Sequence, residues 1–259
     1  MLLVIFALGI VGGLFSGILG IGGAVILIPL LLLVPPLTGA GQLDMGQVTG
    51  LTMIQVLAAS LTAFIAHKRS GFAHKNTVLS IGIPMGICSF AGAAASARLS
   101  HQAMMIIFGI LLLIACILLF ERPRAKDKSE CRDFEFNLQR FLIYGALLGL
   151  MLGVVGAGGG FILIPVMYRM LKVPMRIAVG SSLGIIFIAA IMGSIGKIIA
   201  MQVEWPLVAP IVLGSIPAAL LGSTISKRLP ASHLRRLLIV LIFVILLKTW
   251  YDIAIDIVH

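Results

Sequence analysis

The chain has 259 residues, of which 60% are hydrophobic and only 11% are charged. Soluble domains carry about 25% charged residues, so this composition excludes an ordinary soluble protein and indicates a polytopic membrane protein with the lipid bilayer as its partner. The net charge of +10 does not indicate a nucleic-acid partner, because the basic residues cluster in short connections between apolar runs, where they act as topology signals.

The apolar runs predict membrane-spanning helices. Lipid offers no water partner to backbone groups, and the alternation of about ten residues that is typical of barrel strands is absent, so we predict an all-α fold. The first run lacks a basic start and an A-x-A cleavage site, which favours a retained helix over a signal peptide. The runs cover residues 2–34, 48–66, 77–97, 103–120, 141–168, 177–200, 206–226 and 234–251.

The first run contains a motif that recurs later in the chain. GLFSGILGIGGAVILIP at residues 13–29 and GLMLGVVGAGGGFILIP at residues 149–165 share 10 of 17 positions. The glycines that recur every four residues predict a helix face for close packing in lipid. They are Gly9, Gly13 and Gly17, and then Gly145, Gly149 and Gly153.

The bunched glycines that follow each stripe predict a break in the helix, because glycine tolerates positive φ and close backbone approach. A helix that begins at Gly22 or at Gly158 would aim free N–H groups and its positive dipole end at an oxyanion. A tight turn without a ligand explains either cluster equally well, but the occurrence of both favours an anion site. We therefore predict substrate contacts at Gly22, Gly23, Gly158 and Gly159.

Neutral polar side chains near the matched Gly50 and Gly180 would complete such a site. The alternative is that they hydrogen-bond their own helix. They are Thr49, Thr52 and Gln55 in the first half and Ser181 and Ser182 in the second.

His67 and Lys197 occupy matched positions at helix ends on opposite faces. Such side chains usually snorkel to the interface, but as a pair they are also candidates for drawing anions to the two mouths of a pathway. No carboxylate lies deep in an apolar run, so the usual proton or sodium relay is missing and an anionic substrate is favoured. No metal motif, catalytic residue or cofactor motif is visible, and we expect no enzyme.

The duplication extends over the whole chain, with Ser96 matching Ser226 near the end of the matched region. It predicts a first membrane repeat at residues 1–120, a charged cytoplasmic linker at 121–137 and a second repeat at 138–259.

The basic residues predict how the repeats are oriented. If each glycine-rich run turns back to the face from which it entered, all but three of the 19 Lys and Arg residues lie on one side; the exceptions are Arg98, Lys197 and Lys248. Each half then has five segments, an odd number, so the halves are inverted. We predict about ten membrane segments in two inverted five-segment repeats, each starting with a broken helical hairpin. This architecture is typical of secondary transporters.

These motifs resemble those of the TauE/SafE sulfite exporter family. The resemblance rests on the two glycine clusters with Pro29 and Pro165, on VGSSLG at residues 179–184 and on His67 with Gly71. It implies a multi-pass transporter of sulfite, sulfonates or related organosulfur anions in the cytoplasmic (inner) membrane. TGLTMIQ at residues 49–55 departs from the G-[ST]-S-L run at residues 180–183.

The sequence leaves alternatives open for the function and for the oligomeric state. A channel-like uniporter for other small anions fits the missing carboxylates. A membrane-embedded enzyme or an assembly subunit fits the residues less well. A homodimer is among the assemblies that the sequence allows.

Overall fold

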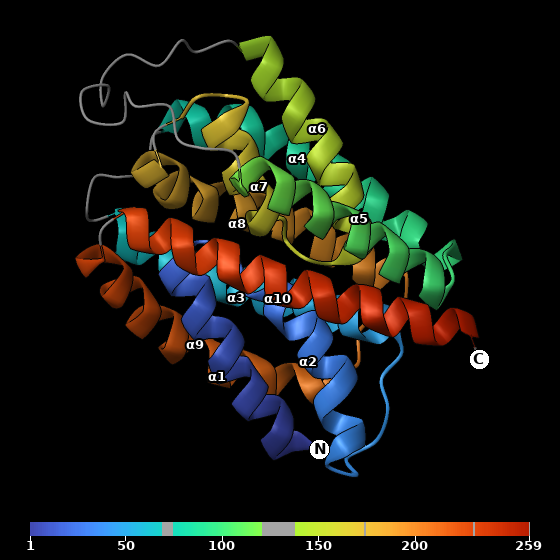
Figure 1. Cartoon of the computed structure of the whole chain (residues 1–259). Coiled ribbons are helices and arrows are strands. Elements are labelled where there is room, and N and C mark those ends of the chain that lie inside the picture. The colour runs from blue at the N-terminus through green and yellow to red at the C-terminus, as the bar shows by residue number, and fades with distance from the viewer. Residues whose placement is uncertain (69–74, 121–137, 174, 230, 259) are drawn as a thin grey trace.

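The computed structural model describes residues 1–68, 75–120, 138–173, 175–229 and 231–258, and this part of the chain consists of helices and their connections, without strands (Figure 1). The helices of the first half are α1 (Leu2–Leu19), α2 (Ala24–Leu37), α3 (Met45–Lys68), α4 (Lys75–Ala95), the short 3₁₀ helix η1 (Ser96–Arg98) and α5 (His101–Phe120). Those of the second half are α6 (Leu138–Val155), α7 (Gly160–Arg169), α8 (Met175–Ile199), α9 (Trp205–Arg228) and α10 (Ala231–Val258).

Eight of these helices are long and apolar enough to cross a membrane. The exceptions, α2 and α7, are shorter apolar helices, and each directly follows a glycine cluster. The apolar run at residues 2–34 is therefore two antiparallel helices, which lie side by side in Figure 1. The predicted fold, a polytopic all-α protein with a broken hairpin at the start of each half, is confirmed.

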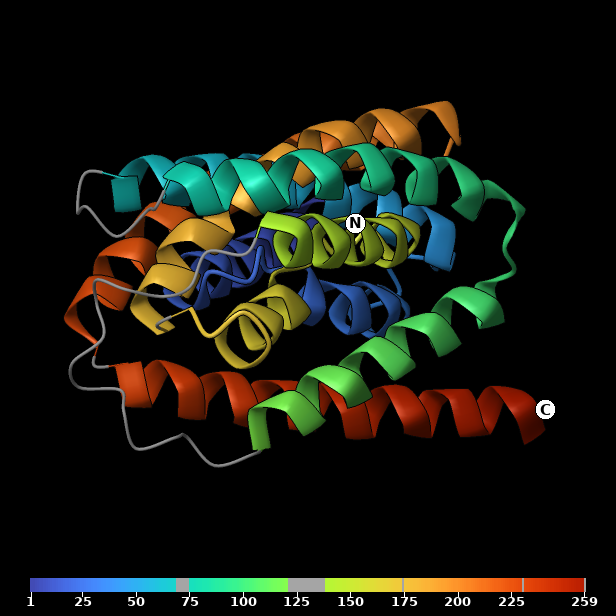
Figure 2. The same cartoon turned by 90° about the horizontal axis from the view of Figure 1, so that it is seen from above.

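The two halves are interleaved and run in opposite directions. In Figure 1, α1 rises from the N-terminus at the bottom, whereas α6 descends from the top. Helix α1 packs along α9 of the other half, and α6 packs in the same way along α4. Helices α5 and α10 pack on each other along one side of the molecule (Figure 2).

The glycine stripes make these contacts between the halves possible. A side chain on Gly13 would collide with the backbone of Ser215 in α9, and one on Gly149 with the backbone of Met85 in α4. Without Cβ atoms, the backbones approach closely enough for van der Waals packing, which drives helix association in lipid. The packing role that the sequence predicts for the stripes is confirmed.

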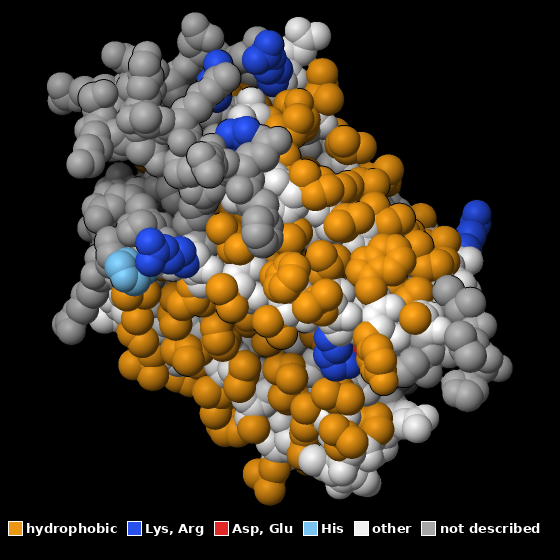
Figure 3. All heavy atoms as spheres, viewed as in Figure 1, with side chains coloured by type: hydrophobic (Ala, Val, Ile, Leu, Met, Phe, Trp, Pro, Cys, Tyr) orange, Lys and Arg blue, Asp and Glu red, His pale blue; other side chains and the backbone are white. Residues whose placement is uncertain are grey.

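The outer surface suits hydrocarbon. Large apolar side chains are exposed along most helices, including Leu3 of α1, Ile87 of α4, Ile143 of α6 and Leu221 of α9. In Figure 3 hydrophobic side chains cover the middle of the visible face, and several described basic side chains gather at its upper left. An apolar surface this extensive marks a membrane contact rather than a surface in water.

Candidate functional site

Both glycine clusters are sharp breaks in the backbone. The φ angles are 71°, 81° and 81° at Gly20, Gly22 and Gly23, and 68°, 58° and 87° at Gly156, Gly158 and Gly159. This left-handed region favours glycine over residues with a Cβ atom. The return helices begin at Ala24 and Gly160, two residues later than the sequence predicts, and Gly23 and Gly159 are their N-caps.

Neither return helix has a side-chain cap. The first amides of a helix have no partner within the helix, so an uncapped start presents free N–H donors and the positive end of the helix dipole. The starts of α2 and α7 therefore offer the same kind of donor surface, one from each half.

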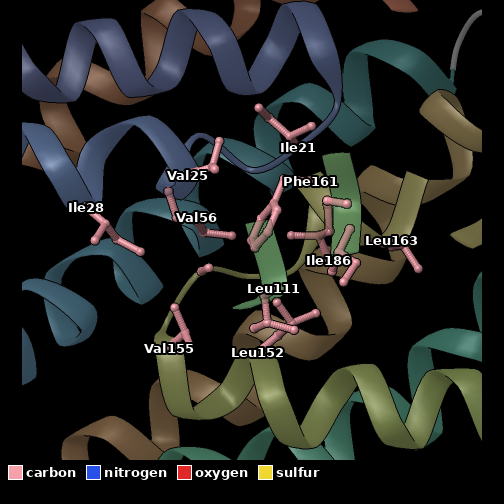
Figure 4. Packing of buried hydrophobic residues seen from close by; sticks show 14 of the residues in the cluster. Ile21, Val25, Ile28, Val56, Leu111, Leu152, Val155, Phe161, Leu163 and Ile186 are labelled. Carbon is pink, nitrogen blue, oxygen red and sulfur yellow. The ribbon is translucent and has the colours of Figure 1, made fainter. Parts of the chain in front are cut away.

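The two breaks touch each other. A side chain on Gly160 would collide with the backbone of Ile21, and Gly22 and Gly158 both face Val56 of α3 and Ile186 of α8. Figure 4 shows Ile21, Phe161, Val56 and Ile186 close together around the breaks. All four are buried, so the donors of the breaks lie in an apolar environment.

Thr52 and Ser182 bind the breaks reciprocally. Thr52 Oγ1 of the first half donates to the carbonyl of Gly156 in the second half, at 3.0 Å. Ser182 Oγ of the second half donates to the carbonyl of Gly20 in the first half, at 2.9 Å. Each hydroxyl also lies near a carbonyl of its own helix, as the alternative interpretation of the sequence predicts, and the substrate role of Thr52 and Ser182 stays a prediction.

Gln55 differs from the other predicted site residues. Its side chain is fully buried, yet neither the amide nitrogen nor the amide oxygen has a hydrogen-bond partner. Because it follows Thr52 by three residues, it is a neighbour of Thr52 on the same helix face. A buried amide without hydrogen-bond partners lowers the stability of the fold, so we expect a ligand or a water molecule to bind it.

The two halves are not equivalent at this position. The residue of α8 that matches Gln55 is Ile185, which is also fully buried.

Ser16 and Ser194 are the other residues in the described part with a buried side-chain oxygen that lacks a partner. Ser181 is fully buried, and its substrate role stays a prediction.

Lys197 does not snorkel to the interface, and that interpretation of the sequence was wrong. Its side chain is fully buried. Its ammonium donates to Thr49 Oγ1 at 2.9 Å, Ser96 Oγ at 2.8 Å, the Val154 carbonyl at 2.9 Å and Gln202 Oε1 at 2.8 Å. The matched residue, His67, belongs to α3, but its side chain lies outside the described part of the structure.

The Val154 carbonyl is an acceptor at a helix end. Val154 lies in the last turn of α6, directly before the second break. Helix C-termini carry a partial negative charge and unpaired carbonyls, which favour a nearby cation. Of the other partners, the sequence analysis named Thr49 as a candidate site residue and Ser96 only as a matched position in the duplication, and it did not indicate Gln202.

A second polar cluster lies at the helix ends near Lys197. Gln47 Nε2 donates to Glu204 Oε1 at 2.6 Å, and the Asp44 carboxylate lies 3.1 Å from His101 Nδ1. Partial burial raises the pKa of Asp44, but the hydrogen bond from the Gly46 amide and the bond and charge of His101 outweigh it, so the pKa is below its usual value. Among the described residues, no three His, Cys, Asp or Glu side chains gather as a metal site would require.

Comparison with known proteins identifies the family. The profile described as "Sulfite exporter TauE/SafE" matches residues 5–249. The chain belongs to the TauE/SafE sulfite exporter family. The family resemblance inferred from the glycine motifs is thereby confirmed, and the chain is a multi-pass membrane transporter.

Several curated relatives match most of the length of this TauE/SafE chain. The probable membrane transporter protein YunE of Bacillus subtilis is 22% identical over 242 residues, which cover 87% of this chain and 89% of the relative. The probable membrane transporter protein MJ0441 of Methanocaldococcus jannaschii is 26% identical over 248 residues, or 92% and 90% of the two chains. No solved structure matches the chain.

Proposed function

We propose that this TauE/SafE transporter carries a small sulfur-containing anion, such as sulfite, a sulfonate or a related organosulfur anion, across the cytoplasmic membrane. The anion is held between the starts of α2 and α7, near Gly22, Gly23, Gly158 and Gly159. The observation that carries the proposal is the contact between the two breaks, which brings two uncapped helix starts together from opposite halves.

Three physical properties of this region favour an anion. Free amides and positive dipole ends stabilise negative charge, and they act more strongly in apolar surroundings than in water. The amide of Gln55 has an unused donor, one helix turn after Thr52, which bonds to the second break. Lys197 Nζ bonds to the carbonyl of Val154, two residues before the second break, and its four described partners are all neutral.

Gln55 provides the sharpest test of the site. We expect Gln55→Leu to abolish or weaken at least tenfold the binding of the transported anion, because the amide donor is lost. The same change removes an unsatisfied buried amide, whose desolvation costs about 1–3 kcal/mol, so the ligand-free variant is expected to be more thermostable than the wild type. A variant that binds less while melting higher cannot owe its defect to misfolding.

The measurement is the thermal midpoint of the purified protein in sulfite, thiosulfate, taurine, sulfoacetate and chloride, since a ligand that binds only the folded state raises it. Ser194→Ala is the matched control, because it removes another unpartnered buried group from α8. A Gln55→Leu variant with undiminished stabilisation by the same anion would contradict this site. Stabilisation by chloride alone would contradict the substrate class.

The positions of the acids favour a test for passive flux as well. Among the acids whose side chains the structure describes, Asp44 precedes α3, Glu204 precedes α9 and Asp252 pairs with Lys248 near the end of α10, so none of these three lies in the breaks. Flux in proteoliposomes that follows the anion gradient alone, without response to pH or sodium, would favour the channel-like uniporter. Dependence on either ion gradient would favour a coupled transporter.

A further inference from the structure

Lys197 connects parts of the molecule that are distant in sequence. Its four acceptors belong to α3, η1, α6 and the 200–204 connection, and Lys197 itself belongs to α8. We call the end of the molecule that is formed by the starts of α3 and α5 and by residues 200–204 the outer end. The sequence analysis predicts that Arg98 and Lys197 lie on the side opposite the cytoplasmic linker. In Figures 1 and 2 the start of α5 lies at the right, as does the C-terminus.

The bonds of Lys197 continue toward the surface of the outer end. Ser96 Oγ donates to Gln202 Oε1 at 2.9 Å, so two acceptors of Lys197 also bind each other. Gln202 packs against Gly46 and Gly50 of α3, and Gln47 between them bonds to Glu204. With Lys197, Ser96 and Gln202 form a polar network that runs from the partly exposed Gln202 at the outer end to the last turn of α6.

The ammonium group is shared among more acceptors than it can serve at once. A lysine has three N–H donors, whereas four oxygens lie within 2.9 Å of Nζ. All four are neutral, and a hydrogen bond to an ionised acceptor is roughly twice as strong as one to a neutral acceptor. An anion that reaches Lys197 is therefore expected to displace one or more of them.

We propose that Lys197 closes a gate at the outer end and that the transported anion opens it by taking over the ammonium group. With the gate closed, Lys197 holds α3, η1, α6 and residues 200–204 together around the second break. When an anion at the break binds the ammonium, the carbonyl of Val154 and the side chains of Ser96 and Gln202 lose their donor, and the elements of the outer end can separate. A ligand shifts a two-state equilibrium only through such a difference in its contacts between the states.

The anion-dependent part of this proposal rests on the proposed function, whereas the closing role of Lys197 does not. A cysteine reporter separates the two. Val155 is fully buried at the end of α6, directly after Val154. In a protein whose Cys88, Cys116 and Cys131 are replaced by serine, Val155→Cys is labelled with a membrane-impermeant maleimide added at the outer side.

We expect Lys197→Met to raise the labelling rate at least tenfold, because the gate loses its central donor, and Lys197→Arg to raise it less. Sulfoacetate is expected to raise the rate in the Lys197 protein and to have no effect in Lys197→Met, with gluconate at equal ionic strength as the control anion. Lys248→Met is the matched control, since Lys248 bonds to Asp252 within α10 and takes no part in the gate. It is expected to label at the wild-type rate.

Because Lys197→Met removes the donor that four acceptors share, Gln202→Leu provides a milder variant. It leaves the ammonium with three acceptors and is expected to give a smaller increase in labelling. Unchanged labelling in both variants would overturn the gate. Increased labelling in both variants, without a response of the Lys197 protein to sulfoacetate, would overturn the anion-driven opening and count against the sulfonate as cargo, while the closing role of Lys197 would stand.

Discussion

At the scale of single residues, the most consequential contacts are the reciprocal hydrogen bonds of Thr52 and Ser182. Each hydroxyl bonds to a carbonyl in the glycine break of the opposite half. Both carbonyls belong to glycines with positive φ, so the chain there cannot continue a helical hydrogen-bond pattern. The two side chains therefore donate hydrogen bonds to buried carbonyls that the breaks would otherwise leave without a partner.

We expect Thr52→Val and Ser182→Ala to destabilise the protein by similar amounts, about 1–3 kcal/mol each, because each leaves a buried carbonyl without its donor. Thr52→Ser keeps the hydroxyl and is the control. The measurement is the midpoint of thermal unfolding in detergent. Loss of stability in only one of the two variants would show that the breaks are held unequally, against the reciprocity of the contacts.

At the scale of helices, the glycine stripes set the distance between the halves. Gly9, Gly13 and Gly17 face Ile211, Ser215 and Ala219 of α9, and Gly145, Gly149 and Gly153 face Ile81, Met85 and Ser89 of α4. The backbone atoms of the partner helix occupy the space in which a Cβ atom would lie. Because α1 and α6 lead directly into the breaks, their packing also positions the candidate anion site.

Gly149→Ala is expected to force α6 away from α4 and to destabilise the protein by roughly 1–3 kcal/mol, the usual cost of overpacking. Gly86→Ala is the matched control on α4, since the nearest atoms to its new methyl group lie at 3.4 Å, an ordinary van der Waals distance. Thermal midpoints and anion binding should both fall for Gly149→Ala and stay unchanged for Gly86→Ala. An equal effect of the two changes would contradict the role of the stripe.

At the scale of the whole molecule, the inversion of the halves places equivalent features at opposite ends. The connection between α2 and α3 and the connection between α7 and α8 follow the two return helices in the same way. In inverted repeats these connections lie on opposite sides of the membrane. Lys197 near the outer end and His67 near the other end then occupy matched positions of the two inverted repeats.

Cysteine labelling in intact cells tests the inversion. Thr38→Cys, after α2, and Lys172→Cys, after α7, replace exposed residues. We expect a membrane-impermeant reagent outside the cell to label the first and to reach the second only after the membrane is permeabilised. Labelling of both from the same side would contradict the inverted arrangement and, with it, a site shared between two helix starts from opposite faces.

The sequence by itself determined the membrane class and the breaks, because these depend on local properties: apolar length, loop charge and bunched glycine. Its division into two repeats at residues 1–120 and 138–259 stays a prediction. It also selected Thr52, Gln55 and Ser182 as candidates, although it could not decide which hydroxyls bond to backbone. The linker that it predicts at residues 121–137 lies outside the described residues.

Only the tertiary structure decided how the polar groups are paired. Lys197 ends up buried because the end of α6, η1 and residues 200–204 converge on it, and such convergence depends on contacts between segments far apart in the chain. Whether Gln55 has a hydrogen-bond partner also depends on residues from other helices and not on its neighbours along α3, and the packed structure leaves its amide without one. Burial and hydrogen bonding are properties of the packed whole, whereas helix breaks and charge distribution can be read along the chain.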